Sequence, residues 1–193
     1  MVPNTKYSNR LDDYIVVFDN IISDELSDRI LEEYGNSIYW QDGLVGTGVI
    51  DKNYRDVDIV GMSFPQIIQE NFAVRKQLDN DVFECANLAI RKYNEKFPEA
   101  RIQQDSGYEL LRYNTGQKYE QHTDSFRERN RAVSCSFMLN DDYLGGEFAF
   151  FNRKLKYKLP KGSVLMFPSN FMYPHEIMPV TKGTRYSIIT WFV

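Results

Sequence analysis

From residue 107 onward the chain reads GYELLRYNTGQKYEQHTD, which ends at Asp124 and marks a change from helical to extended patterning. Short apolar and aromatic runs, separated by turn residues, continue from here to the C-terminus, as is typical of strands. The expected strands are 108–113, 118–123, 133–139, 147–151, 163–167, 176–180 and 185–193. Because helical patterns precede these strands, the order of elements predicts an α+β, mostly β protein with helices packed on a β sandwich or barrel.

The preceding residues are expected to form a strand, helices and a loop. The strand is expected over 14–22, and a first helix from the N-cap residue Ser23 to Gly35. Residues 64–97 predict further helix, since apolar side chains repeat there on one helical face. Between these helices, residues 36–63 contain four glycines and a cluster of charges. They predict a mobile lid loop with a strand at its base.

Composition limits the class of protein. The 193 residues predict one domain over 1–193, with an N-terminal part over 1–106 and a core over 107–193. The formal net charge is −4 and no basic stripe is visible, which argues against a dedicated nucleic-acid-binding protein. Cys85 and Cys135 lack the spacing of a metal or redox motif.

Membrane and export signals are not visible in the sequence. No apolar run approaches the length that spans a bilayer, and residues 1–6 lack the apolar region of a signal peptide. We therefore expect a cytoplasmic protein without a disulfide framework and without a membrane partner.

The chain contains only two histidines, His122 and His175. Asp124 follows His122 by two residues, and side chains at this spacing on a strand point to the same face. Two imidazoles and one carboxylate with open coordination positions form the facial triad of non-heme Fe(II) oxygenases. Each histidine also has a simpler interpretation: His122 as a half-buried side chain beside a solvated aspartate, and His175 as a core or turn residue after Pro174.

Arg185 is a second candidate for a functional side chain. We expect it on a strand that runs beside the strand holding His175. An arginine in an aromatic interior needs an anionic partner, because burying an unpaired charge is costly. The guanidinium group binds carboxylates in a bidentate fork. Taken alone, the residue type favours a surface arginine as the simpler interpretation of Arg185.

Residues 112–124 closely resemble the first metal-binding segment of prolyl 4-hydroxylase-like 2-oxoglutarate/Fe(II) dioxygenases. Further runs in the same order resemble that family: LGGEF at 144–148, PKGSVLMFPS at 160–169, and the segment from His175 through PVTKGTRYS at 179–187 to Trp191. The resemblance covers roughly 107–193. The N-terminal half is similar only in its layout of a strand and buttressing helices.

This resemblance implies a double-stranded β-helix (jelly-roll) catalytic core with the N-terminal helices packed on one sheet. It implies His122, Asp124 and His175 as Fe(II) ligands, and Arg185 as the partner of the distal carboxylate of 2-oxoglutarate. Related halogenases lack the carboxylate ligand, so Asp124 indicates a hydroxylase.

The resemblance also identifies cosubstrate residues and one departure. Tyr113 corresponds to a tyrosine that lines the cosubstrate pocket. Met138 stands where the family usually has a second tyrosine, whose hydroxyl helps to bind 2-oxoglutarate. We therefore expect Arg185 to be assisted by Ser134, Ser136 or Tyr113.

Three residues are predicted on the substrate side of the site. Tyr119 and Trp191 correspond to family aromatic residues near the metal. Arg55 lies in Asn53-Tyr54-Arg55-Asp56, which loosely resembles the loop that closes over the peptide in prolyl hydroxylases. A solvated charge cluster is the alternative interpretation of Arg55.

The implied activity is hydroxylation of a peptidyl proline with Fe(II), O2 and 2-oxoglutarate, which is converted to succinate; ascorbate is a further candidate cofactor. The expected partner is a proline-containing peptide or protein. Three alternatives are the same chemistry on another side chain or a small metabolite, a nucleic-acid demethylase, and a non-enzymatic jelly-roll binding module. The acidic balance argues against the second alternative, and the complete triad with Arg185 argues against the third.

Overall fold

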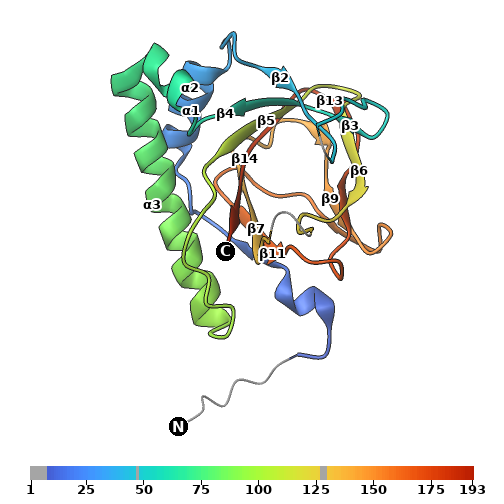
Figure 1. Cartoon of the computed structure of the whole chain (residues 1–193). Helices are drawn as coiled ribbons and strands as arrows, with labels where there is room; N and C mark the ends of the chain where they lie inside the picture. The colour runs from blue at the N-terminus through green and yellow to red at the C-terminus, as the bar shows by residue number, and fades with distance from the viewer. Residues whose placement is uncertain (1–7, 47, 127–129) are drawn as a thin grey trace.

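A computed structural model describes residues 8–46, 48–126 and 130–193, and it shows two antiparallel β-sheets with a helical layer on one side (Figure 1). The segment 1–6, on which the expected absence of a signal peptide rests, lies outside the described residues. Among the helices that the structure describes, none is long and apolar enough to cross a membrane.

The two sheets form the jelly-roll core that the sequence predicts. The larger sheet contains, in spatial order, β1 (Val16–Phe18), β11 (Val164–Pro168), β7 (Val133–Met138), β14 (Arg185–Phe192), β5 (Glu109–Tyr113), β4 (Asp58–Gly61) and β2 (Gln41–Asp42). The smaller sheet contains β10 (Leu155–Tyr157), β9 (Phe148–Phe150), β12 (His175–Ile177), β6 (Lys118–His122) and β3 (Arg55–Asp56). A separate antiparallel pair is formed by β13 (Val180–Lys182) and β8 (Leu144–Gly145).

The helical layer consists of α1 (Asp24–Tyr34), α2 (Pro65–Glu70) and α3 (Phe72–Lys96), and a short 3-10 helix, Leu11–Tyr14, precedes β1. The predicted N-cap is confirmed, because the Ser23 side chain accepts a hydrogen bond of 3.1 Å from the Leu26 N–H. The predicted helix over 64–97 is broken at Asn71, whose backbone (φ −137°, ψ 67°) leaves the helical region and separates α2 from α3.

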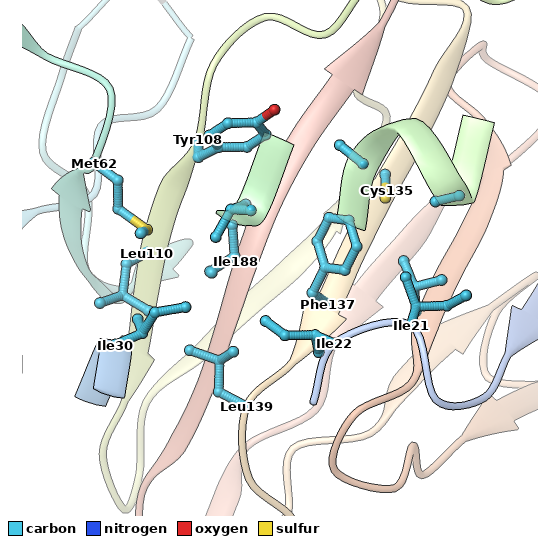
Figure 2. Close-up of a cluster of buried hydrophobic side chains, with 14 of the residues drawn as sticks. Ile21, Ile22, Ile30, Met62, Tyr108, Leu110, Cys135, Phe137, Leu139 and Ile188 are labelled. Atoms are coloured by element: carbon cyan, nitrogen blue, oxygen red, sulfur yellow. The ribbon is translucent and has the colours of Figure 1, made fainter. Parts of the chain in front are cut away.

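The outer face of the larger sheet is apolar and lies under α1 and α3. Leu110, Phe137 and Ile188 come from three neighbouring strands, and each has 0% exposed surface. They share one core with Ile30 of α1 and with the buried face of α3 (Figure 2). Helix packing therefore protects this face of the sheet from water.

The inner face of the larger sheet is more polar. Side chains alternate between the two faces of a strand, so Ser134, Ser136 and Met138 of β7 point toward the smaller sheet. On β14 the inward positions include Arg185 and Ser187, both almost fully buried. The sequence thus places polar and charged groups inside the sandwich.

Several sequence predictions need correction. The first strand is only Val16–Phe18, shorter than the predicted 14–22, and the strand predicted over 176–180 is divided between β12 and β13. The two- and three-residue strands β8 and β10 were not predicted, because so few residues show no alternation.

The segment 36–63 is more than a lid with one basal strand. It supplies β2 and β4 to the larger sheet and β3 to the smaller sheet, and Val57 and Val60 are buried in the two cores. Each of the two sheets therefore contains strands from before and from after the predicted boundary between residues 106 and 107. The assignment of 1–193 as one domain stays a prediction.

Candidate active site

Two histidines and an aspartate meet between the sheets. The ligand atoms of His122, Asp124 and His175 all lie within 4.8 Å of one another. The Nε2 atom of His122 is 3.5 Å from Asp124 Oδ1, and the Nε2 atom of His175 is 3.6 Å from Asp124 Oδ2. The three side chains thus point their potential ligand atoms at one position.

The two histidines are brought together by strand pairing. His122 on β6 lies directly opposite His175 on β12 in the antiparallel register. The sequence predicted that Asp124 lies on the same strand as His122. This prediction is wrong, because β6 ends at His122. The place of Asp124 is fixed instead by its backbone N–H, which donates to the Ser169 carbonyl oxygen at 3.2 Å.

Local backbone carbonyls orient both imidazole rings. The Nδ1 atom of His122 lies 2.9 Å from the Glu120 carbonyl oxygen, and the Nδ1 atom of His175 lies 3.1 Å from that of Tyr173. A carbonyl oxygen can only accept, so each Nδ1 carries the proton and each Nε2 keeps its lone pair toward Asp124. Such outer contacts fix the tautomer of metal-binding histidines.

The charge states of the cluster suit a divalent cation. Burial acts to raise the pKa of Asp124, but the adjacent His175 and His122 and the hydrogen bond from Ser134 outweigh it and hold this pKa well below its usual range. Burial and the neighbouring His122 lower the pKa of His175 to about 4. At neutral pH the site therefore offers an ionised carboxylate and a neutral imidazole, the forms that bind metals.

Ser134 lies beside Asp124 rather than beside Arg185. Its hydroxyl donates to Asp124 Oδ2 at 2.6 Å and lies 2.7 Å from the Ser169 hydroxyl. Ser134 therefore orients the carboxylate directly, and Ser169 orients the Ser134 hydroxyl. The predicted contact of Ser134 with the cosubstrate stays a prediction.

Arg185 is buried, with 1% of its surface exposed, so the surface interpretation is wrong. Its Nη1 donates to the Ser187 hydroxyl at 2.8 Å and its Nη2 to the Met138 sulfur at 3.5 Å. The Nε group has no hydrogen-bond partner, and no carboxylate of the described residues forms an ion pair with this guanidinium. A buried cation without an anion is costly, so the site calls for an anionic ligand.

The relation between Arg185 and His175 differs from the prediction. β14 pairs with β5 and β7 in the larger sheet, whereas β12 pairs with β6 and β9 in the smaller sheet. The two strands are therefore not neighbours, and the two residues belong to opposite walls of the sandwich.

Tyr143 is a further neighbour of Arg185 that the sequence did not reveal. Burial raises its pKa, while the charge of Arg185 and a hydrogen bond with it act in the opposite direction. A Cβ atom at Gly146 would lie 3.1 Å from both Arg185 Cδ and Tyr143 Cε2, so glycine permits their close approach. Met138 replaces the family tyrosine, and Ser187 and Tyr143 supply hydroxyl groups beside Arg185 instead. The Tyr113 ring lies 5.3 Å from the guanidinium carbon.

Arg55 and Tyr119 lie next to the metal ligands. The Tyr119 ring stacks on His122, with 3.5 Å between centroids and 14° between planes. The Arg55 guanidinium carbon lies 4.7 Å from the Tyr119 centroid, and Arg55 Nη1 donates to the Leu44 carbonyl oxygen. This stack connects the 36–63 segment to the metal site.

A cavity of about 680 Å³ contains the triad, Arg185 and the predicted substrate residues, a volume typical of small-molecule sites. Trp191 lies on its wall with the Arg131 guanidinium carbon 3.4 Å from the indole centroid. Exposed apolar side chains, including Leu44, Phe64 and Phe126, also line it. The wall of the cavity thus combines exposed apolar side chains with charged ones.

Sequence comparisons agree with this geometry. Residues 108–193 match the family model of the 2OG-Fe(II) oxygenase superfamily. A PKHD-type hydroxylase of Synechococcus elongatus is 33% identical over 140 residues, which cover 65% of this chain and 61% of that protein. A PKHD-type hydroxylase of Janthinobacterium is 27% identical over 165 residues, covering 79% of this chain and 66% of that protein. The chain spans only 39% of the length of some other relatives of this type.

Solved structures show the same fold. A prolyl hydroxylase from Trichoplax adhaerens, in complex with a hypoxia inducible factor peptide fragment, superposes with a TM-score of 0.76 at 20% identity, covering 95% of this chain and 86% of that one. A viral collagen prolyl hydroxylase from Paramecium Bursaria Chlorella virus-1, in its 2OG complex, has a TM-score of 0.65 at 18% identity, covering 93% and 95%. The family match over residues 108–193, the PKHD-type hydroxylase relatives and the shared jelly-roll fold together support a prolyl 4-hydroxylase-like 2OG-Fe(II) oxygenase.

Proposed function

We propose that this protein is an Fe(II)/2-oxoglutarate-dependent dioxygenase that hydroxylates a prolyl residue in a peptide or protein. The observation that supports it most is the convergence of His122, Asp124 and His175 in a cavity that also holds the unpaired cation of Arg185. The first three residues provide a metal site, and the fourth provides an anion site inside the same cavity.

The donor set fits Fe(II). Two imidazole nitrogens and one carboxylate form the facial triad, which leaves coordination positions open for other ligands. His175 has 3% of its surface exposed and is surrounded by the rings of Phe148, Phe150 and Phe167, whose centroids lie 4.6 to 6.2 Å away. These rings exclude water from one side of the metal position and keep the imidazole neutral.

The surroundings of Arg185 fit the distal carboxylate of 2-oxoglutarate. Its unpartnered Nε is a buried donor, and a guanidinium binds a carboxylate through two parallel hydrogen bonds. The Ser187 and Tyr143 hydroxyls are further hydrogen-bonding groups beside it. The Tyr113 ring lies 5.3 Å from the guanidinium carbon and forms one wall of this anion site.

Bound Fe(II) supplies the redox chemistry by which O2 and 2-oxoglutarate give succinate, CO2 and one oxygen atom inserted into a substrate C–H bond. The protein supplies binding, orientation and protection from water. Asp124, held by Ser134 and Ser169, and the two histidines, held by backbone carbonyls, keep the metal ligands in a fixed geometry.

A prolyl substrate is supported by the relatives, which include prolyl hydroxylases, one of them in complex with a peptide. In this chain the Arg131–Trp191 pair and the Arg55–Tyr119 stack line the cavity. Flat rings and engaged guanidinium groups form walls that suit the compact ring of a proline.

The proposal is tested with purified protein, Fe(II), 2-oxoglutarate and a library of proline-containing peptides. We expect succinate formation and a mass gain of one oxygen atom on a prolyl residue, and loss of both in His122→Ala. Glu176→Gln is the matched control, because Glu176 is next to His175 but its side chain pairs with Arg153 at 2.8 Å, away from the triad. Oxygen gain on another residue type, or full turnover by His122→Ala, would overturn the proposal.

A further inference from the structure

We propose that Glu109 recognises a basic side chain of the substrate, so that the preferred peptides carry a lysine or arginine close to the hydroxylated prolyl residue. This inference rests on the proposed function and names the substrate class for the same cavity.

Glu109 lies on the inner face of the larger sheet. It occupies β5 at the same face as Leu111 and Tyr113, because residues two apart on a strand share a face. It lies opposite Ile189 of β14 on one side and Gly61 of β4 on the other. β4, β5 and β14 run side by side in Figure 1. The carboxylate thus lines the cavity that contains the triad.

Apart from Arg185, the other charged side chains on the cavity wall already have partners. Asp42 forms an ion pair of 2.6 Å with Lys52, and Arg55 and Arg131 each donate to a backbone carbonyl and stack on an aromatic ring. Arg185 lacks an anionic partner, but as a cation it would repel a basic side chain. Within the described ranges, no hydrogen bond or ion pair engages the Glu109 carboxylate, so its charge faces the cavity alone.

A second polar group in the same row of the sheet also lacks a partner. Ser136 lies opposite Ile189 on the far side of β14, and only 2% of its surface is exposed. Its hydroxyl has no hydrogen-bond partner and lines the same cavity. Burying an unsatisfied hydroxyl is unfavourable unless a ligand supplies the partner. Ser136 and Glu109 therefore indicate polar ligand groups on both sides of Ile189.

The neighbours of Glu109 suit a long basic side chain. Ile189 and Leu111 flank it, and the Phe64 ring lies against Gly61, 2.4 Å from where a Cβ atom would be. Lysine and arginine combine an aliphatic stem with a charged head. The apolar neighbours match the stem, and the carboxylate matches the head.

The position of Glu109 sets how far the basic residue lies from the prolyl residue. Ser134, whose hydroxyl donates to Asp124, serves as a marker of the metal position. It lies on β7, two strands away from Glu109 on β5, and two residues along β7 from Ser136, which shares a row of the sheet with Glu109. Strand spacing and rise then give about 12 Å between the two backbone positions. A basic side chain from within a few residues of the prolyl residue spans this distance. The arginines near the metal would repel the same cation, so the substrate has a preferred orientation.

The test uses three prolyl peptides that differ only at one position, which is lysine, norleucine or glutamate. Each peptide is tested with the wild-type protein, with Glu109→Gln and Glu109→Lys, and with the control variant Asp42→Asn. Peptide affinity is measured by fluorescence anisotropy with Fe(II) and 2-oxoglutarate under anaerobic conditions, and oxygen gain is measured separately by mass spectrometry. We expect wild type and Asp42→Asn to prefer the lysine peptide roughly tenfold. Glu109→Gln should lose this preference, and Glu109→Lys should prefer the glutamate peptide.

The preference should also weaken as salt rises, because a partly exposed ion pair is screened. An unchanged rank order of the three peptides in Glu109→Lys would overturn the inference. If wild type oxidises the peptides without regard to charge, the inference fails while the proposed function stands. If wild type oxidises no prolyl peptide at all, the proposed function itself fails.

Discussion

The two faces of the larger sheet are built from the same strands and differ in almost every other respect. On β7, Cys135 and Phe137 face the helices and Ser134 and Ser136 face the cavity. The outer side chains fill an apolar core, whereas the inner ones contact a metal carboxylate or have no partner at all. Alternation along one strand thus separates the side chains of the apolar core from those that line the cavity.

The sharpest version of this comparison uses two adjacent residues. Phe137→Ala should destabilise the protein by about 3–5 kcal/mol, because it leaves a cavity under the helices. Ser136→Ala should change the free energy of unfolding by less than about 1 kcal/mol, or raise it, since it removes a buried unsatisfied hydroxyl. Urea unfolding followed by circular dichroism measures both, and equal losses would break the comparison.

Arg185→Met should separate binding from stability within the inner face. We expect the Kd for 2-oxoglutarate to rise roughly 100-fold, about 3 kcal/mol, because the carboxylate loses its charged partner. The Kd for Fe(II) should change little. The free energy of unfolding should stay the same or rise, since a buried unpaired cation is removed. Calorimetric titration of each ligand checks this, and equal losses for Fe(II) and 2-oxoglutarate would contradict the assigned role.

Ser134→Ala should weaken the binding of Fe(II) and leave the binding of 2-oxoglutarate unchanged, the reverse of Arg185→Met. Removing an outer hydrogen bond to a metal ligand costs roughly 10- to 100-fold in metal affinity. The affinity for 2-oxoglutarate, measured at saturating Fe(II), should stay near the wild-type value. Ser163→Ala is a suitable control, because Ser163 is buried but donates to the Pro160 carbonyl oxygen, outside the cavity. A larger effect on 2-oxoglutarate than on Fe(II) would favour the original prediction that Ser134 contacts the cosubstrate.

The smallest expected effect concerns the thiols. Burial raises the pKa of Cys85 to about 11 and raises that of Cys135 well above its usual value. The thiolate is the reactive form, so both cysteines should react slowly with iodoacetamide at pH 8, and Cys85 should react faster only as the pH approaches 11. Mass spectrometry of the native and urea-unfolded protein measures this. Rapid labelling of native Cys135 would show that the outer face is not closed.

The sequence predicted those features that depend on local pattern. Alternation placed most strands of the core to within a few residues, and the N-cap at Ser23 marked the start of α1. The spacing of His122 and Asp124 and the resemblance around them led to three residues that the structure brings together.

Features set by long-range pairing could not be predicted in the same way. The register of β6 and β12 places the two histidines opposite each other, and only the sheet order shows that β14 belongs to the other wall. Strand β3 forms because Arg55 pairs with Tyr119, a residue 64 positions later in the sequence. Tyr143 and Glu109 gain their surroundings from residues distant in sequence, so no local pattern marks them.

The central claim is that the two sheets together assemble one site, with the histidine ligands on the smaller sheet and Arg185 on the larger sheet. Its most direct test is an anaerobic absorption titration. Wild-type protein with both Fe(II) and 2-oxoglutarate should develop the weak visible charge-transfer band of a chelated iron centre, and neither ligand alone should produce it. His175→Ala should abolish the band, and Arg185→Met should require far more 2-oxoglutarate to reach it. A band of full intensity at the same ligand concentrations in both variants would contradict the account.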